Sequence, residues 1–421
     1  MEVKLKYGQK EIALDVSKKA IISVLNPSTV PIIEEVGKEF ERVMNAPLGG
    51  KGLEGIKPPA SVAIAVSDES RPTPTKLLLP LLLKRLYQAY PNLTPEQITV
   101  VIGSGLHPPL DKEGIRRVVP EFTAPGCKVV AHDAVCSSMT DCGITSRGTP
   151  VLINREIVDA ELKLAIGNID PHQFVGFTGG SKGIIIGCGS KSTIEANHAL
   201  MFDEKAHVAN IEGNPVRQDI DEAGRMIGVS LVINVVLNVS NRIVRLLAGE
   251  PVSVYREGAG TCASLYGVVI DEKFDIAIAS CGGYPKDINL YQAQKAFAHA
   301  AQAVKPGGKI VVLAQCPHGV GDDVYFNYVR GMSTPHEVLD DFKEHGFRMG
   351  AHKAFLLSRT LVSFDVAIAS DMNREILQKC HLRKCEAQET IDEWISDFPG
   401  NPRIAVIPKA SSTFFYEKQF F

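Results

Sequence analysis

The sequence lacks three features that mark exported and membrane proteins. No stretch approaches the ~18 to 20 consecutive apolar residues that a membrane span requires. The start, MEVKLKYGQ, has no apolar core behind a basic end, so we expect no secretory signal. The nine cysteines include no CxxC pair, which favours reduced thiols over a disulfide framework. These absences predict a cytoplasmic protein that does not engage a membrane.

The chain also has no excess of charge of either sign. Its 45 Lys and Arg residues against 48 Asp and Glu residues give a formal net charge of −3. Without a basic field, nucleic acid is not expected as a partner. A hydrophobic fraction of 45% over 421 residues is that of an ordinary globular chain, long enough for two or three domains.

Short apolar runs alternate with helical patterns along most of the chain. Strands are expected at residues 61–66, 98–102, 162–169, 275–279 and 309–314, and helices at 74–90, 111–119, 251–265 and 288–304. Continuous apolar strands separated by helices are typical of parallel sheets covered on both faces. We therefore predict an α/β protein with mostly parallel sheets and flanking helices.

The alternating pattern restarts near residue 271, which predicts two domains. The N-terminal domain would cover residues 1–270 and the C-terminal α/β domain residues 271–405. The remaining tail, residues 406–421, ends in several aromatic residues. Because such a segment is too apolar to remain in solvent, we expect it to pack back on a domain.

Polar side chains directly follow three of the expected strands in the first half of the chain. Asp68 and Arg71 follow the first strand, His107 follows the second, and His172 follows the third within Asp170-Pro171-His172. Ligands of open α/β sheets bind outside the carboxyl ends of the strands. These side chains are therefore candidates for one common crevice.

The stretch richest in chemistry is residues 170–201, DPHQFVGFTGGSKGIIIGCGSKSTIEANHALM. Its glycines, among them Gly179 and Gly180, permit backbone angles that other residues avoid, and Lys182 stands at the tip of the loop. His198 is expected on the helix that follows, on a fixed scaffold. In the second half of the chain, Tyr291, Gln292 and Lys295 begin a helix after a strand. Taken by itself, that pattern is more typical of a solvated surface helix with an extended lysine.

Three other kinds of protein share some of these features. A P-loop nucleotide hydrolase needs Gly before its Lys and Ser or Thr after it, but Ser181 and Gly183 flank Lys182. A nicotinamide dehydrogenase needs a strand that leads into GxGxxG with an acidic residue about 20 positions later, and no strand does so. A non-catalytic protein that binds a small carboxylic acid through Arg71 and Lys295 would not need the histidines.

In their order along the chain, these motifs resemble the nickel-pincer nucleotide-dependent lactate racemase family of 2-hydroxyacid racemases and epimerases. The motifs are Asp68-x-x-Arg71, Gly105-x-His107, Asp170-Pro171-His172, Gly179-Gly180-x-Lys182, Thr193-Ile194-x-x-Asn197-His198 and Tyr291-Gln292-x-x-Lys295. Several spaced motifs in register are much more specific than any one glycine-rich loop.

The resemblance implies a role for each candidate residue. Lys182 would hold the nickel-pincer nucleotide covalently, with Asp68, Gly179 and Gly180 also at the cofactor. His198 would be the protein ligand of the nickel, a metal that imidazole binds well. His107 and His172 would be the acid/base pair for the substrate hydroxyl on its two faces. The substrate would also be bound by Arg71, Tyr291, Gln292 and Lys295.

The resemblance further implies the reaction and its participants. The N-terminal domain would bind the cofactor, and the active site would lie in the interdomain cleft. The α-hydrogen of a 2-hydroxy acid would leave as hydride, through a 2-oxo acid, and return to either face. Other enzymes must synthesise the cofactor, so the expected partners are a small-molecule 2-hydroxy acid and those biosynthetic enzymes.

Two departures from the family pattern concern the substrate. Pro108 and Pro109 follow His107 where a basic residue is expected, and Gln173 stands where an aromatic residue is expected after His172. Both positions border the substrate rather than the cofactor. Lactate is therefore one candidate beside longer, dicarboxylic and sugar-derived 2-hydroxy acids.

Overall fold

The computed structural model describes residues 1–16, 19–28 and 30–417, which form two compact units. The central unit is Val30–Cys262, and the terminal unit combines Met1–Thr29 with Ala263–Phe421. The expected two-domain α/β organisation is confirmed, but the expected domain of residues 1–270 differs from the central unit at its start and at its end, since the central unit stops at Cys262. The first residues belong to the terminal unit because β3 (Ile21–Val24) pairs with β19 (Arg403–Ile407).

The central unit is built on a six-stranded sheet with the order β13-β12-β9-β4-β5-β6. All neighbours are parallel except β13, which is antiparallel to β12. The strands are β4 (Val62–Ser67), β5 (Ile98–Gly103), β6 (Lys128–Ala131), β9 (Leu162–Ile169), β12 (Leu231–Leu237) and β13 (Ile243–Gly249). The three strands predicted in this half are thus neighbours at the centre of the sheet.

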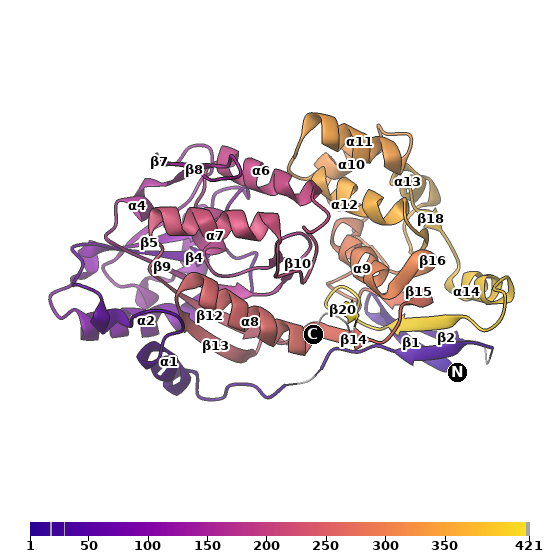
Figure 1. Ribbon diagram of the computed structural model, residues 1–421, viewed down its shortest axis with the longest axis horizontal. Coiled ribbons are helices and arrows are strands. Elements are labelled where there is room, and N and C mark those ends of the chain that lie inside the picture. Colours follow the sequence, from indigo (N-terminus) through magenta and orange to yellow (C-terminus); the bar gives the residue numbers. More distant parts are fainter. Residues whose placement is uncertain (17–18, 29, 418–421) are drawn as a thin grey trace. The chain divides into compact units, whose positions relative to one another are not determined.

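Helices cover both faces of this sheet, with α1 and α2 on one side and α7 on the other (Figure 1). The α-helices are α1 (Val36–Asn45), α2 (Thr75–Ala89), α3 (Lys112–Val118), α4 (Arg155–Val158), α5 (Lys182–Ile185), α6 (Lys191–Ala199), α7 (Pro215–Ile227) and α8 (Pro251–Tyr266). Two small antiparallel ladders pair β7 (Met139–Ile144) with β8 (Pro150–Asn154) and β10 (Pro171–His172) with β11 (Gly176–Phe177).

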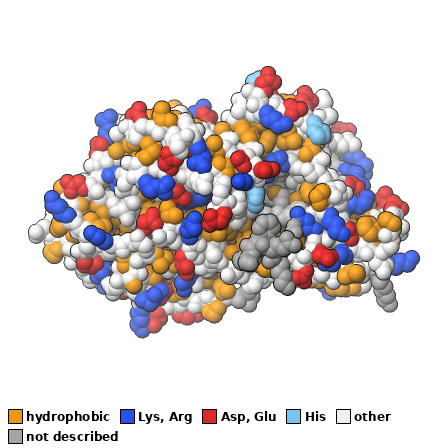
Figure 2. All heavy atoms as spheres, viewed as in Figure 1, with side chains coloured by type: hydrophobic (Ala, Val, Ile, Leu, Met, Phe, Trp, Pro, Cys, Tyr) orange, Lys and Arg blue, Asp and Glu red, His pale blue; other side chains and the backbone are white. Residues whose placement is uncertain are grey.

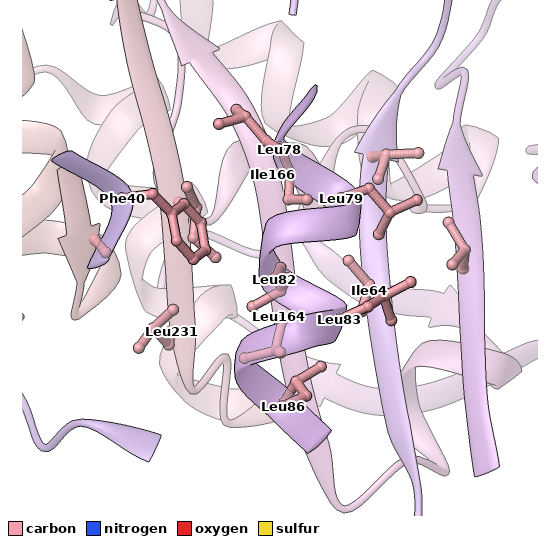
Figure 3. Close-up of a cluster of buried hydrophobic side chains, with 14 of the residues drawn as sticks. Phe40, Ile64, Leu78, Leu79, Leu82, Leu83, Leu86, Leu164, Ile166 and Leu231 are labelled. Atoms are coloured by element: carbon pink, nitrogen blue, oxygen red, sulfur yellow. The ribbon is translucent and has the colours of Figure 1, made fainter. Parts of the chain in front are cut away.

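The core of the central unit lies between α2 and the sheet. Figure 3 shows the leucines of α2 packed against Ile64 of β4 and Leu164 of β9, with Phe40 of α1 beside them. Leu82 is fully buried there. Burial of one such side chain is worth about 1.5–3 kcal/mol relative to exposure, so this leucine-rich face fixes the helix on the strands whose ends carry the candidate residues.

The terminal unit contains a six-stranded, fully parallel sheet with the order β18-β17-β16-β15-β19-β3. The strands not yet introduced are β15 (Phe274–Ser280), β16 (Val304–Leu313), β17 (Asp365–Ala369) and β18 (Arg383–Lys384). The helices are α9 (Leu290–Ala303), α10 (Asp323–Val329), α11 (Pro335–His345), α12 (His352–Leu361), α13 (Arg374–Lys379) and α14 (Ala387–Ser396). The N-terminal hairpin of β1 (Glu2–Tyr7) and β2 (Lys10–Asp15) completes this unit.

The tail packs back on the terminal unit as far as the structure describes it. β20 (Phe414–Glu417) pairs in parallel with β14 (Gly267–Ile270), and Phe414 is fully buried. Residues 418–421 of the expected tail lie outside the described residues. The described part of the tail is therefore held by strand pairing and by the burial of Phe414.

The visible surface carries side chains of both charges, as the nearly equal numbers of acidic and basic residues predict. Figure 2 shows acidic and basic side chains interspersed on the visible face. In the described part of the chain, no helix combines the length and the apolarity needed to cross a membrane.

The leucine face of α2 gives a stability prediction. Leu82→Ala should lower the free energy of unfolding by about 2–5 kcal/mol, because it leaves a cavity in a fully packed region. Leu77→Ala on the same helix is the control: Leu77 is 44% exposed, so its loss should cost no more than about 0.5 kcal/mol. Urea unfolding followed by circular dichroism measures both, and equal effects would contradict this description of the core.

Candidate active site

Three loops of the central unit bring candidate residues to one edge of the sheet. β4, β5 and β9 run in parallel, with Val66 opposite both Ile102 and Ile166. Their carboxyl ends therefore meet at the same edge. Asp68 and Arg71 follow β4, His107 follows β5, and His172 follows β9, as the sequence predicts.

Asp68 and His107 form a direct pair between two of these loops. His107 Nδ1 lies 2.8 Å from Asp68 Oδ2, and Ser70 donates to Asp68 Oδ1 from both its backbone nitrogen and its hydroxyl. Burial opposes ionisation of Asp68, but the hydrogen bonds from His107 and Ser70 outweigh it and lower the pKa of the carboxyl group. A carboxylate at Nδ1 requires a proton on that nitrogen, so Nε2 is the basic nitrogen of a neutral His107.

A close backbone contact joins the His107 loop to the segment that follows Lys182. Gly105, with φ of +57°, donates its N–H to Gly187 O at 2.9 Å. A Cβ atom on Gly103 would lie 3.0 Å from the carbonyl carbon of Gly187. A side chain at either glycine would crowd this close approach of the two segments.

The Gly179-Gly180 turn that precedes Lys182 is held by two polar side chains from other elements, Asn234 and Arg217. Gly179 and Gly180 have φ of +90° and +57°. Gly180 N–H donates to Asn234 Oδ1 at 2.8 Å, and Arg217 Nη1 donates to Gly179 O at 2.9 Å. A Cβ on Gly179 would lie 2.4 Å from Ile169 Cγ1, and one on Gly180 would lie 2.6 Å from Arg217 Nη2. The turn therefore requires glycine at both positions.

Arg217 is a residue of this site that no motif in the sequence revealed. Its side chain is 2% exposed, its Nε donates to Asp221 at 3.0 Å, and its guanidinium carbon lies 3.8 Å from the centre of the Tyr255 ring. The Asn214-Pro215 start of α7 and the i,i+4 spacing of Arg217 and Asp221 predict an ion pair, but not its contact with the glycine turn.

The environment of Lys182 changes the chemistry of its amine. Burial, together with the positive charges of Arg71 and Arg217, lowers the pKa of Lys182 to about 7. A large share of the side chain is therefore a neutral amine at neutral pH, and a neutral amine is nucleophilic. α5, which begins at Lys182, is four residues long. This loop thus lacks the long helix that follows the phosphate-binding loop of a P-loop hydrolase.

His172 and His198 both pack against the ring of Phe174. The Phe174 ring centre is 4.7 Å from that of His172 and 5.0 Å from that of His198, with edge-to-face geometry in both pairs. His172 belongs to the β10–β11 ladder, and His198 projects from α6. The structure therefore brings these two predicted residues into one neighbourhood.

His198 is held in position by hydrogen bonds that begin in another helix. Its Nδ1 lies 3.1 Å from Asn197 Oδ1, and Asn197 Nδ2 donates to Asp219 Oδ2 of α7 at 2.8 Å. Ser190 caps α6 by accepting a hydrogen bond from Thr193 N. A hydrogen bond at Nδ1 orients the ring and designates Nε2 as the nitrogen for a metal.

Tyr291, Gln292 and Lys295 lie in the first turns of α9, in the terminal unit. Asn289 caps the helix by accepting a hydrogen bond from Gln292 N at 2.9 Å. The Tyr291 ring packs edge-on against Tyr325 at 6.1 Å between ring centres. The predicted helix is confirmed, while the substrate role of these three residues stays a prediction.

Within the described ranges, no group of three or more His, Cys, Asp or Glu side chains is arranged to hold a metal ion. The role of His198 as a nickel ligand stays a prediction, and its Nδ1 lies near Asn197 Oδ1. A nickel ion bound there needs its other donors from a bound molecule.

Comparisons with known proteins match both halves of the chain. The lactate racemase N-terminal domain family matches residues 7–209, and the lactate racemase C-terminal domain family matches residues 269–414. The lactate racemase of Thermoanaerobacterium thermosaccharolyticum is 27% identical over 427 residues, with 99% of each chain covered. That of Lactiplantibacillus plantarum is 30% identical over 362 residues, with 84% of each covered.

Solved structures agree with these matches. The Thermoanaerobacterium thermosaccharolyticum lactate racemase apoprotein gives a TM-score of 0.89 at 27% identity, over 99% of this chain and 100% of that one. A protein from Thermotoga maritima gives 0.61 at 16% identity, over 94% and 100%, and shares the fold. On these matches, the chain belongs to the lactate racemase family, a family of isomerases.

Proposed function

We propose that this protein is a racemase or epimerase of a 2-hydroxy acid, and that it uses a nickel-pincer nucleotide attached to Lys182. The observation that carries the proposal is the Lys182 amine, which has a pKa lowered to about 7 and stands on a glycine turn fixed by Arg217. A non-catalytic binding protein has no use for a nucleophilic lysine in this position.

The residues around Lys182 fit a covalently held cofactor. The neutral amine can attack an activated carbonyl-type carbon. Gly179 and Gly180, which form the turn before Lys182, are assigned to the cofactor as well. The His198 imidazole supplies a nickel ligand of the right chemistry. When bound, the cofactor supplies the hydride acceptor that an unactivated 2-hydroxy acid requires.

His107 and His172 are the general acid/base groups for the substrate hydroxyl. With Nδ1 bonded to Asp68, His107 takes this proton at Nε2, and the adjacent carboxylate stabilises the imidazolium that results. His172, from the loop after β9, serves the opposite enantiomer. When one histidine removes the hydroxyl proton of one enantiomer, the other histidine donates a proton to the oxygen of the opposite enantiomer as it forms.

Arg71 binds the substrate carboxylate, because its planar guanidinium fits a carboxylate with two hydrogen bonds. Tyr291, Gln292 and Lys295 are assigned to the substrate as well. Asp68, which contacts His107, is also assigned to binding of the cofactor. The biosynthetic enzymes that make the cofactor are the partners that this function requires.

Covalent attachment is tested by intact-mass and nickel analysis after co-expression with cofactor-making enzymes. The wild-type protein should carry a mass adduct on Lys182 together with nickel and should racemise a 2-hydroxy acid. Lys182→Ala should lose the adduct, whereas Lys191→Ala, a change at an exposed lysine of α6, should keep it. An unmodified wild-type mass, without nickel and without any change in optical activity, would lead us to abandon the proposal.

Variants of His107, His172 and His198 should lose different properties of the enzyme. His107→Ala and His172→Ala should retain adduct and nickel but lose roughly 10² to 10⁴-fold or more in racemisation rate, because general acid/base catalysis is worth that much. His198→Ala should lose nickel. Chiral chromatography and metal analysis of the purified variants measure both properties. Full racemase activity in either of the first two variants would contradict the two-base mechanism.

The lowered pKa of Lys182 should be measurable in the cofactor-free protein. Because its pKa is lowered to about 7, the neutral fraction rises with pH and is nearly complete by about pH 8. Labelling of the cofactor-free protein by an amine-reactive reagent should therefore level off there at the Lys182 peptide, as measured by mass spectrometry. Labelling that still rises to about pH 10, the range of an ordinary lysine, would show that the pKa of Lys182 is not lowered.

A further inference from the structure

A short segment of the central unit joins the two residues that are assigned to the cofactor at its opposite attachments. Lys182 begins α5, His198 lies near the end of α6, and residues 186–190, which we call the connector, lie between the two helices. A cofactor that is bonded to Lys182 and shares its nickel with His198 requires a fixed separation of these side chains. The contacts of the connector therefore bear on the proposed function.

Four consecutive residues of the connector, 187–190, are hydrogen-bonded to other segments through their backbone groups. Three of these bonds come from backbone partners, at 2.8–2.9 Å: they join Gly105 to Gly187, Asn154 to Cys188, and Leu152 to Ser190. The fourth comes from a side chain, since His132 Nε2 lies 2.9 Å from Gly189 O. A substitution at His132 can therefore loosen the connector without changing the three backbone partners.

The imidazole of His132 has a defined protonation state. His132 directly follows β6 and is fully buried. Because Gly189 O can only accept a hydrogen bond, the proton of the imidazole lies on Nε2. Burial lowers the pKa of His132, so the ring is neutral near pH 7 and its Nδ1 is an acceptor. Asn154 Nδ2 donates to this Nδ1 at 3.1 Å.

Asn154 is itself held in one orientation and contacts the connector a second time. Its Oδ1 accepts a hydrogen bond from Glu156 N at 3.0 Å and caps α4, so Nδ2 is the end that faces His132. Its backbone N–H donates to Cys188 O. The pair of His132 and Asn154 thus holds two adjacent carbonyl groups, those of Cys188 and Gly189. Buried networks in which each group is satisfied are rigid.

We infer that His132 is a positioning residue for the cofactor: supported by Asn154, it fixes the connector so that Lys182 and His198 hold one cofactor together. The inference rests on the proposed function, which assigns Lys182 and His198 to the cofactor. Loss of a group that orients a metal ligand from outside typically weakens metal binding by about 10- to 100-fold. Loss of the His132 contact should therefore release nickel, whereas the Lys182 amine, whose pKa is lowered by other groups, should still form the adduct.

Two substitutions separate the two hydrogen bonds of His132. The amide nitrogen of glutamine reaches about as far from the backbone as Nε2, so His132→Gln should keep the bond to Gly189 O. The asparagine amide reaches only about as far as Nδ1, so His132→Asn should keep the contact with Asn154 and lose that with Gly189. His299→Gln is the matched control, because His299 is a buried histidine of the terminal unit whose Nδ1 donates to Ala410 O at 2.7 Å.

The first measurement is hydrogen exchange of the connector in the cofactor-free protein, followed by mass spectrometry. His132→Asn should exchange roughly tenfold faster there than wild type, as expected for the loss of one buried hydrogen bond. His132→Gln and His299→Gln should exchange like wild type. Equal exchange in His132→Asn and His132→Gln would show that His132 does not hold the connector, and would overturn the inference.

A measurement on wild type covers the case in which His132→Asn does not fold. Nitrogen NMR of protein labelled at its histidines should show His132 neutral with its proton on Nε2, the signal being identified by its absence from His132→Gln. A proton on Nδ1 would mean that the ring cannot donate to Gly189 O through Nε2, and would overturn the inference as well.

The second measurement is the amount of nickel per Lys182 adduct in cofactor-loaded protein after dialysis against EDTA. Wild type, His132→Gln and His299→Gln should keep their nickel. His132→Asn should keep the adduct and retain roughly tenfold less nickel, or lower still. Because the ratio is taken per adduct, a lower yield of loaded protein leaves it unchanged.

The other outcomes of this measurement contradict different claims. Equal nickel per adduct in all four proteins, an equal loss in His132→Asn and His299→Gln, or loss of the adduct itself in His132→Asn refutes the positioning role and leaves the racemase proposal standing. A wild-type protein with neither adduct nor nickel contradicts the proposed function, and with it the inference that rests on that function.

Discussion

The proposed active site depends on the clamped glycine turn at Gly179 and Gly180. Arg217 holds the carbonyl group of Gly179, and Asn234 holds the N–H group of Gly180. Both contacts come from elements far from the turn in sequence, and both glycines have positive φ angles. This clamp sets the backbone from which Lys182 projects. Arg217 also acts directly on the lysine, since its charge contributes to the lowered pKa.

The same design recurs at two other candidate residues, His107 and His198, each of which is oriented by a second polar group. Asp68 holds His107, and Asn197, itself bonded to Asp219, holds His198. Such supporting groups fix the tautomer and the orientation of an imidazole before any substrate arrives. Pre-organisation of this kind lowers the entropic cost of reaching a reactive geometry. The loops are therefore suited to chemistry rather than to simple capture of a ligand.

Much of the fold could be predicted from the sequence because its signals are local. The apolar strand at 162–169 agrees with β9 to the residue, and the polar residues after β4, β5 and β9 do meet at one edge of the sheet. Arg217 could not be predicted as part of the site, since its contact with Gly179 spans 38 residues and depends on tertiary packing. The place of the first residues in the terminal unit likewise follows from pairing with β19, near the other end of the chain.

The central claim is that this enzyme moves the α-hydrogen of its substrate between two faces without exchanging it with water. The most direct measurement is racemisation of a 2-hydroxy acid deuterated at C2, in ordinary water, with the product analysed by chiral separation and mass spectrometry. The account predicts that deuterium is retained at C2 in both enantiomers. Loss of the label at the rate of racemisation would instead mean that a base removes the α-hydrogen as a proton, and would contradict the account.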